Sequence, residues 1–164
     1  MSSVIASPRP RVWEALTERA QILQWRPGAL EALDPEVRYP TPGERVRWRC
    51  RVRDLPLLLE DTPLLVLPGE CLHARLALGL FRFEETFRLG PVPTEPERTR
   101  LGLKIAASNE MPVLGGSLDR FAVREFATQL AATYLQAVRD WCEGSRPTEL
   151  PLPALPHDTT ALRR

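Results

Sequence analysis

Three kinds of sequence pattern follow one another in this chain, and their order is what most constrains the fold. A short helical block comes first, then strand-like sequence as far as Ala107, and then one long amphipathic helix near the end. An antiparallel sheet made of consecutive strands can curl around such a helix, so that each buries its apolar face against the other. The sequence therefore predicts an α+β domain in which a ligand could fit between the sheet and the helix.

Alternating apolar and polar residues indicate the strands. Residues 45–53 read R-V-R-W-R-C-R-V-R, which places apolar side chains on one face of a strand and five arginines on the other. Residues 80–89 alternate in the same way, and the following side chains share one face: Phe81, Phe83, Glu85, Phe87 and Leu89. Residues 57–67 also favour a strand, bent or interrupted at 61–63. Turns rather than helices join these runs, so we expect antiparallel neighbours.

Helical spacing appears at both ends of the chain. The first block, from Pro10, is interrupted at residues 17–19, which predicts one broken helix or two short ones ending before Trp25. From Leu118 to about Cys142 the apolar residues form one stripe, and Gly144 is a natural stop. We expect one domain over residues 1–144 and a proline-rich, mobile tail over residues 145–164.

Composition excludes several classes of protein. The formal net charge is +1, which gives no overall field to attract nucleic acid. Three widely spaced cysteines form no C-x-x-C pair, so neither a zinc knuckle nor a redox dithiol is indicated. No apolar run is long enough to span a membrane, and residues 1–11 lack the features of a signal peptide. We expect a cytoplasmic protein without an integral membrane segment.

The N-terminal residues resemble a known group of proteins. The run from Ile5 to Leu16, I-A-S-P-R-P-R-V-W-E-A-L, is followed by Trp25 and looks like the opening of the START-like or Bet v 1-like (SRPBCC) superfamily. The turn at Gly43 and the aromatic strand over residues 83–87 also resemble the corresponding segments of this superfamily. This superfamily includes the polyketide cyclase/dehydrase and lipid transport families. The resemblance covers about residues 2–143.

What the resemblance implies is a helix-grip fold. In that fold, two short helices follow the first strand, and a seven-stranded antiparallel sheet curls around a long C-terminal helix, with a cavity between them. Members include lipid carriers, quinone binders, cyclases, oxygenase domains and chaperone activators. The oxygenase type needs paired histidines and a carboxylate for iron, whereas this chain has only His73 and His157, so we expect no metal and no cofactor.

Glu85 and Tyr134 are the candidate catalytic residues. Alternation places Glu85 on the inward face between Phe83 and Phe87, where an apolar cavity would raise its pKa and allow acid–base catalysis. The alternatives are a solvated strand end, an arginine that pairs with Glu85, or a shifted register that turns Glu84 inward. Tyr134 lies on the helical stripe and either hydrogen-bonds a ligand or only packs.

The remaining candidates line the expected cavity. The predicted ligand-binding residues are Trp48, Phe81, Phe83, Glu85, Phe87, Leu103, Ile105, Phe126, Leu130 and Tyr134. Cys50 is expected to be an inert packing thiol, and His73 a solvated surface residue. The arginines of 45–53 are expected to form a charge-paired outer face, with partners drawn from Glu60, Asp61, Glu84 and Glu85.

These patterns support three hypotheses. The first is a protein that binds or carries a small hydrophobic molecule such as a lipid, polyketide, isoprenoid or quinone. The second is a cyclase or dehydratase that uses the same cavity, with Glu85 as acid or base and Tyr134 as donor. The third is a protein-interaction module of the chaperone-activator type, in which the cavity is closed.

Overall fold

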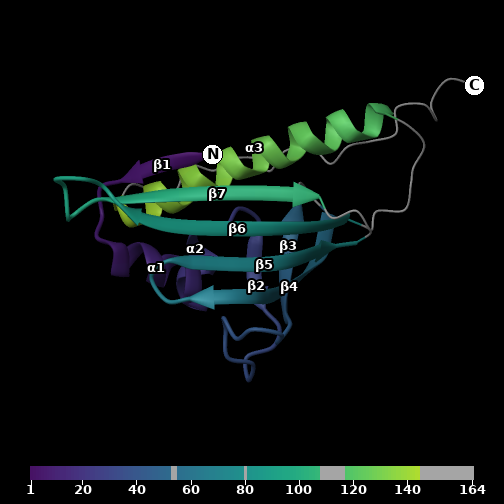
Figure 1. Ribbon diagram of the computed structural model, residues 1–164. Helices are drawn as coiled ribbons and strands as arrows, with labels where there is room; N and C mark the ends of the chain where they lie inside the picture. Colours follow the sequence, from purple (N-terminus) through teal and green to yellow (C-terminus); the bar gives the residue numbers. More distant parts are fainter. Residues whose placement is uncertain (53–54, 80, 108–116, 145–164) are drawn as a thin grey trace, which may run out of the picture.

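Seven strands and three helices make up the computed structural model, which describes residues 1–52, 55–79, 81–107 and 117–144 (Figure 1). The side chains of residues 52, 81 and 117–123 are outside this description. The helices are α1 (Arg9–Thr17), α2 (Arg19–Trp25) and α3 (Ser117–Cys142). The strands are β1 (Ser2–Ile5), β2 (Ala29–Ala32), β3 (Val46–Val52), β4 (Leu55–Leu67), β5 (Cys71–Leu78), β6 (Phe81–Pro91) and β7 (Thr99–Ala107).

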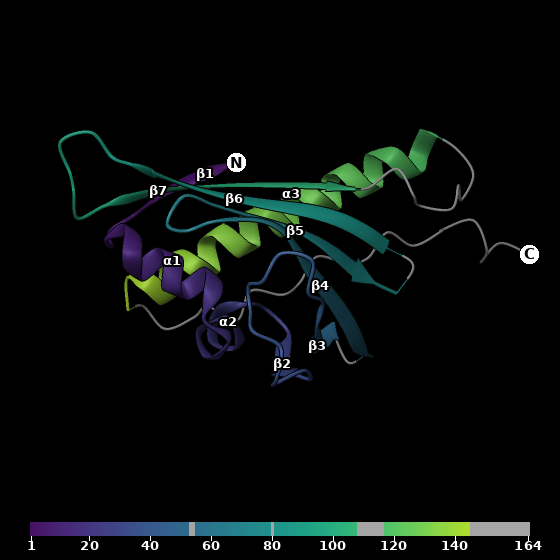
Figure 2. The same cartoon turned by 60° about the horizontal axis from the view of Figure 1, so that its bottom comes forward.

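The strands form one antiparallel sheet in the order β1-β7-β6-β5-β4-β3-β2. The first strand pairs with the last, and the other neighbours follow the chain as a meander. All three helices lie on one side of this sheet, which curves around α3 (Figures 1 and 2). The predicted α+β helix-grip architecture is therefore confirmed, including the two short helices after the first strand.

Two details differ from the expectation or refine it. Trp25 is the last residue of α2, whereas the helical block was expected to end before it. The strand β4 runs without a break from Leu55 to Leu67, and its irregularity is a shift of register between Pro63 and Leu65. Residues 145–164, the expected tail, lie outside the described residues.

The core lies between the concave face of the sheet and the three helices. Trp25 anchors the end of α2 there: its indole N–H donates to the Ala15 carbonyl at 2.6 Å, and its ring meets Phe87 and Tyr134 edge to face. Side chains from six strands join this core: Ile5, Trp48, Leu59, Leu72, Leu76, Phe83, Phe87, Leu101 and Leu103. The side chain that follows Trp25 is consequently held at the centre of the interior.

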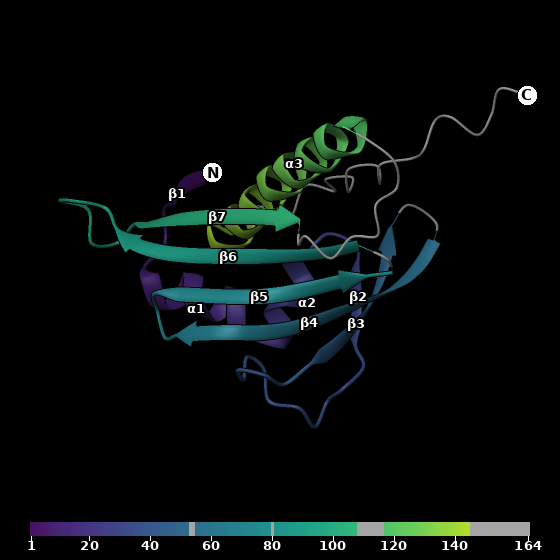
Figure 3. The ribbon, with the colours of Figure 1, turned by 45° about the vertical axis from the view of Figure 1, so that its right-hand side comes forward.

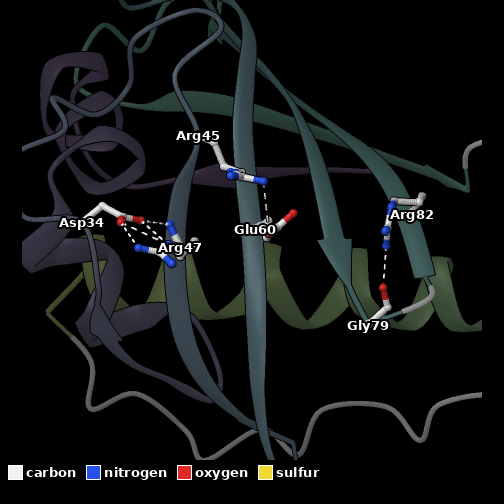
Figure 4. A network of polar contacts seen from close by, with 6 residues as sticks. All are labelled: Asp34, Arg45, Arg47, Glu60, Gly79 and Arg82. Atoms are coloured by element: carbon white, nitrogen blue, oxygen red, sulfur yellow. Dashed lines mark hydrogen bonds and ion pairs between the residues drawn. The ribbon is translucent and has the colours of Figure 1, made fainter.

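None of the described helices covers the opposite face of the sheet (Figure 3). This face carries charged side chains. Arg45 pairs with Glu60 at 3.3 Å, and Arg47 with Asp34 at 2.6 Å (Figure 4). Arg49 pairs with a third carboxylate, Glu31 of β2, at 2.9 Å. The predicted charge-paired face is confirmed for these three arginines.

Two of the expected partners of that face were wrong. Asp61 and Glu85 are fully buried on the inner side of the sheet and pair elsewhere. Glu84 faces outward, where its carboxylate lies 3.3 Å from the partly exposed His73 ring. Arg53 lies outside the described residues.

No helix among the described residues has the length and apolar character needed to cross a bilayer. The same part of the chain contains no group of three histidine, cysteine or carboxylate side chains positioned to hold a metal ion.

Candidate functional site

Arg26 is the centre of the candidate site. It directly follows α2, its backbone N–H donates to the Ile22 carbonyl, and only 5% of the residue is exposed. The guanidinium carbon lies 5.3 Å from the ring centroid of Tyr134 and 5.8 Å from that of Trp25, within the range of cation–π attraction. The position of Trp25 in the core therefore directs the next side chain into the interior.

Two buried carboxylates bind the guanidinium. Arg26 Nη1 donates to Asp61 Oδ2 at 3.3 Å, and Nη2 donates to Glu85 Oε1 at 2.5 Å. Both acidic residues are completely inaccessible to solvent. Tyr39 Oη, from the β2–β3 connection, donates to the same Asp61 oxygen at 3.2 Å. We call Arg26, Asp61, Glu85 and Tyr39 the inner polar cluster.

Strand register explains how these residues meet. Asp61 in β4 is opposite Leu76 of β5, and Glu85 in β6 is opposite Ala74, which is also in β5. Leu76 and Ala74 are consecutive inward-facing residues of β5. The two carboxylates thus stand on either side of β5, about 10 Å apart between strand axes. The small Ala74 side chain occupies little of the space between them, and the long Arg26 side chain spans it.

Burial dominates the electrostatics of the inner polar cluster. Burial raises the pKa of Glu85 to about 7. The positive charge of Arg26 lowers this pKa, and the negative charge of Asp61 raises it further. The pKa of Asp61 is raised for the same first reason, again opposed by Arg26. Burial lowers the pKa of Arg26, but Glu85, Tyr134 and Asp61 raise it well above its usual value, so the guanidinium stays charged. The cluster therefore holds one fixed positive charge and two carboxylates that resist ionisation.

Several polar atoms of this region have no hydrogen-bond partner among the described residues. They are Arg26 Nε, Asp61 Oδ1, Glu85 Oε2 and Trp48 Nε1. The indole N–H of Trp48, on the inner face, lies close enough to Asp61 to help lower the pKa of that carboxyl group, although it does not reach the geometry of a full hydrogen bond. Buried polar groups in native proteins are nearly always paired with protein, water or ligand. These atoms are therefore the polar groups of the interior that the described residues leave without a hydrogen-bond partner.

The structure brings most of the predicted ligand-binding residues to the inner side of the sheet. The following are buried in the common core: Trp48, Phe83, Glu85, Phe87, Leu103, Phe126, Leu130 and Tyr134. Ile105 is only partly buried and packs against that core. Phe81 belongs to β6, but its side chain is outside the description. Their role in binding a ligand stays a prediction.

Glu85 and Tyr134, the two candidate catalytic residues, both lie against Arg26. Burial raises the pKa of Tyr134, so its phenol stays protonated and able to donate a hydrogen bond. Of the alternatives for Glu85, pairing with an arginine is the one that occurs, and the shifted register that would turn Glu84 inward does not. Burial also raises the pKa of Cys50, which fits the inert thiol that was expected.

Sequence reasoning missed Arg26, Asp61 and Tyr39. Arg26 stands in R-P-G, which marks the end of a helix, and nothing local shows that it turns inward. Asp61 carried a usable signal, because Leu57, Leu59 and Asp61 alternate on one face, and pairing of Leu59 with Trp48 makes that face the inner one. Tyr39 lies in an irregular connection that has no periodicity to read.

Comparison with known proteins extends the description of the fold. No protein-family profile matches this chain, and no curated protein matches it. Solved structures do match. A START superfamily protein from Mycobacterium smegmatis superposes with a TM-score of 0.62 at 16% identity, covering 88% of this chain and 92% of that one.

Two further structures show the same likeness. Ara h 8.0201, a Bet v 1 allergen, has a TM-score of 0.66 at 9% identity and covers 88% of this chain and 96% of its own. DynU16, from the dynemicin biosynthetic locus, has a TM-score of 0.62 at 18% identity and covers 90% of this chain, which spans 47% of its length. At such identities the likeness concerns the fold: this chain has the helix-grip fold of START-like and Bet v 1-like proteins.

Proposed function

We propose that this protein binds a small hydrophobic molecule, such as a lipid, polyketide, isoprenoid or quinone, in an internal cavity between the sheet and α3. The observation that carries the proposal is the inner polar cluster, whose unpaired atoms lie in an otherwise apolar interior. Leaving such atoms unpaired costs about 1–3 kcal/mol each. A bound molecule that supplies the missing partners recovers part of this free energy.

The chemistry of the surrounding side chains supports an apolar ligand body. Aromatic and aliphatic residues from both layers enclose the region of Arg26, and Phe83 of β6 already meets Phe126 of α3 at 5.7 Å between ring centroids. Ligand sites in proteins are mostly apolar, with a few polar groups that set orientation. In this proposal the apolar residues hold the ligand body, and the inner polar cluster and Tyr134 orient its polar end.

Titration with the uncharged fluorescent probe N-phenyl-naphthylamine tests the proposal, with native mass spectrometry of the purified protein as a second readout. The matched variants are Leu130→Trp and Gln129→Trp, neighbouring positions of α3 of which the first is buried and the second exposed. Wild type and Gln129→Trp should bind the probe, and Leu130→Trp should bind it about tenfold or more weakly because the indole fills the site.

Circular dichroism shows whether each variant is folded. A folded Leu130→Trp protein that binds the probe as tightly as wild type would place the binding site elsewhere. A wild-type protein that neither binds the probe nor carries any apolar molecule in the mass spectrum would contradict the proposal itself.

Glu85 supports a second candidate function, a cyclase or dehydratase that uses the same site. Burial brings the pKa of Glu85 to about 7, where a carboxyl group can both accept and donate a proton near neutrality. Its Oε2 atom has no hydrogen-bond partner among the residues that the structure describes, so this oxygen is available to a substrate. Dehydration of a β-hydroxyketone probe should then be lost in Glu85→Gln and retained in Glu84→Gln, whose side chain is on the outer face. Equal turnover by both variants would exclude this function.

A further inference from the structure

A buried arginine in an apolar interior ordinarily indicates a receptor for an anion. Arginine binds carboxylate and phosphate groups through two parallel N–H donors of its planar fork. In this protein, however, Nη1 of Arg26 is bound to Asp61 and Nη2 is bound to Glu85. Of the three guanidinium nitrogens, Nε alone is free among the described residues. Nη1 and Nη2 each keep a second N–H, but a further carboxylate could use these only beside the carboxylate that each nitrogen already binds.

The charge around Arg26 also opposes an anion. One guanidinium is surrounded by two carboxyl groups, both inaccessible to water. When both carboxyl groups are ionised, the inner polar cluster carries a net charge of minus one. A third carboxylate at the same place would add like-charge repulsion that the buried interior screens poorly. Binding it would require that one of the resident carboxylates leave or become protonated.

The unpaired atoms are of both hydrogen-bonding kinds. Arg26 Nε is a donor and Glu85 Oε2 is an acceptor when its carboxyl group is ionised, whereas the Trp48 indole N–H already interacts with Asp61. A hydroxyl group both donates and accepts, whereas a carboxylate and an ester oxygen only accept. The group that fits this set of atoms is therefore a neutral hydroxyl.

From these observations we infer that the site selects ligands with a hydroxyl-bearing, uncharged head and excludes those with an anionic head such as fatty acids. The inference rests on the proposed binding function and specifies its ligand class. Asp61 and Glu85 are then the residues that determine specificity, because they occupy the arginine that an acid would need. Arg26 positions these two carboxylates rather than anchoring an anion.

Displacement of N-phenyl-naphthylamine by three amphiphiles with the same alkyl chain tests the inference. The competitors are dodecanol, methyl dodecanoate and dodecanoic acid, each kept below its solubility limit or critical micelle concentration, at about pH 8, where the acid and Glu85 are both ionised. Dodecanol should bind most tightly, the ester next, and the acid about tenfold or more weakly than the alcohol. The ester separates the effect of charge from that of the donated hydrogen bond.

A substitution provides a second, independent arm. Glu85→Gln removes one negative charge with little change of shape, so it should narrow the gap between alcohol and acid about tenfold. Glu84→Gln removes the same charge from the outer face and should leave the wild-type ranking unchanged. The wild-type ranking stands without either variant, so a variant that failed to fold would not weaken the test.

The possible results separate the two claims. Tightest binding of the acid, or equal binding of all three amphiphiles, overturns the inference about the head group and leaves the binding function in place. Failure of the wild-type protein to bind the probe and all three amphiphiles overturns the proposed function, and the inference falls with it.

Discussion

Replacing Glu85 by glutamine should change how stability depends on pH. In the folded protein burial raises the pKa of Glu85 from 4.5 to about 7, so the folded state holds a proton that the unfolded chain releases earlier. The contribution of protonated Glu85 to the free energy of unfolding is therefore fully present below pH 4.5 and is lost as pH rises through about 7. At about 1.4 kcal/mol for each pKa unit, the rise corresponds to a loss of about 3–4 kcal/mol across this window. Glutamine does not titrate and should not show this loss.

Urea denaturation followed by circular dichroism measures the effect. The free energy of unfolding is compared for wild type, Glu85→Gln and Glu84→Gln at several pH values between about 5 and 8. The wild-type curve should fall relative to that of Glu85→Gln by up to about 3–4 kcal/mol, because the charged carboxylate is costly in the interior. Glu84→Gln should follow the wild-type curve, since its side chain is on the outer face. Parallel curves for wild type and Glu85→Gln would refute the reasoning.

Three further changes test the contacts around the site. Arg26→Met leaves two carboxyl groups buried without their cation and should lower the free energy of unfolding, measured by urea denaturation, by about 3–5 kcal/mol. Most of this loss should be recovered when Asp61 and Glu85 are also replaced by their neutral amides. A loss below about 1 kcal/mol would show that the guanidinium is not needed for stability. Tyr39→Phe removes the 3.2 Å hydrogen bond to Asp61 and should cost about 1 kcal/mol in the same assay, and an unchanged midpoint would count against that bond. Asp34→Asn should destabilise the protein at neutral pH, because hydrogen bonds from Arg47 lower the pKa of Asp34 from 3.8 to about 2. In the same urea assay, the difference in free energy of unfolding between wild type and Asp34→Asn should vanish as pH falls through this interval. A difference that stays constant with pH would contradict this prediction.

Periodicity made the architecture predictable from sequence. The arginine alternation of β3 and the phenylalanine alternation of β6 each allow one buried face, and the helical stripe of α3 supplies the surface that covers both. These patterns are local, so they can be recognised in the sequence without knowing which element packs against which. The same alternation places Glu85 on the inner face, as the one polar residue on the apolar side of β6, and Glu85 is completely buried.

The partners of Glu85 could not be predicted in the same way. Arg26 is 59 positions away from Glu85 in sequence and 35 from Asp61, and it lies at a helix end where no periodicity fixes its direction. Its direction depends on Trp25 being held in the core by a hydrogen bond to Ala15, which is a tertiary contact. For Asp61, the proline two residues later resembled an interruption and hid the alternation that continues through it.

A crystal structure of the protein grown with dodecanol measures the main proposal most directly. The account predicts electron density for the alkyl chain between the sheet and α3, with the hydroxyl oxygen within hydrogen-bond distance of Arg26 Nε and of a free oxygen of Asp61 or Glu85. An interior closely packed with side chains, and the alcohol absent or bound only on the outside of the protein, would contradict it.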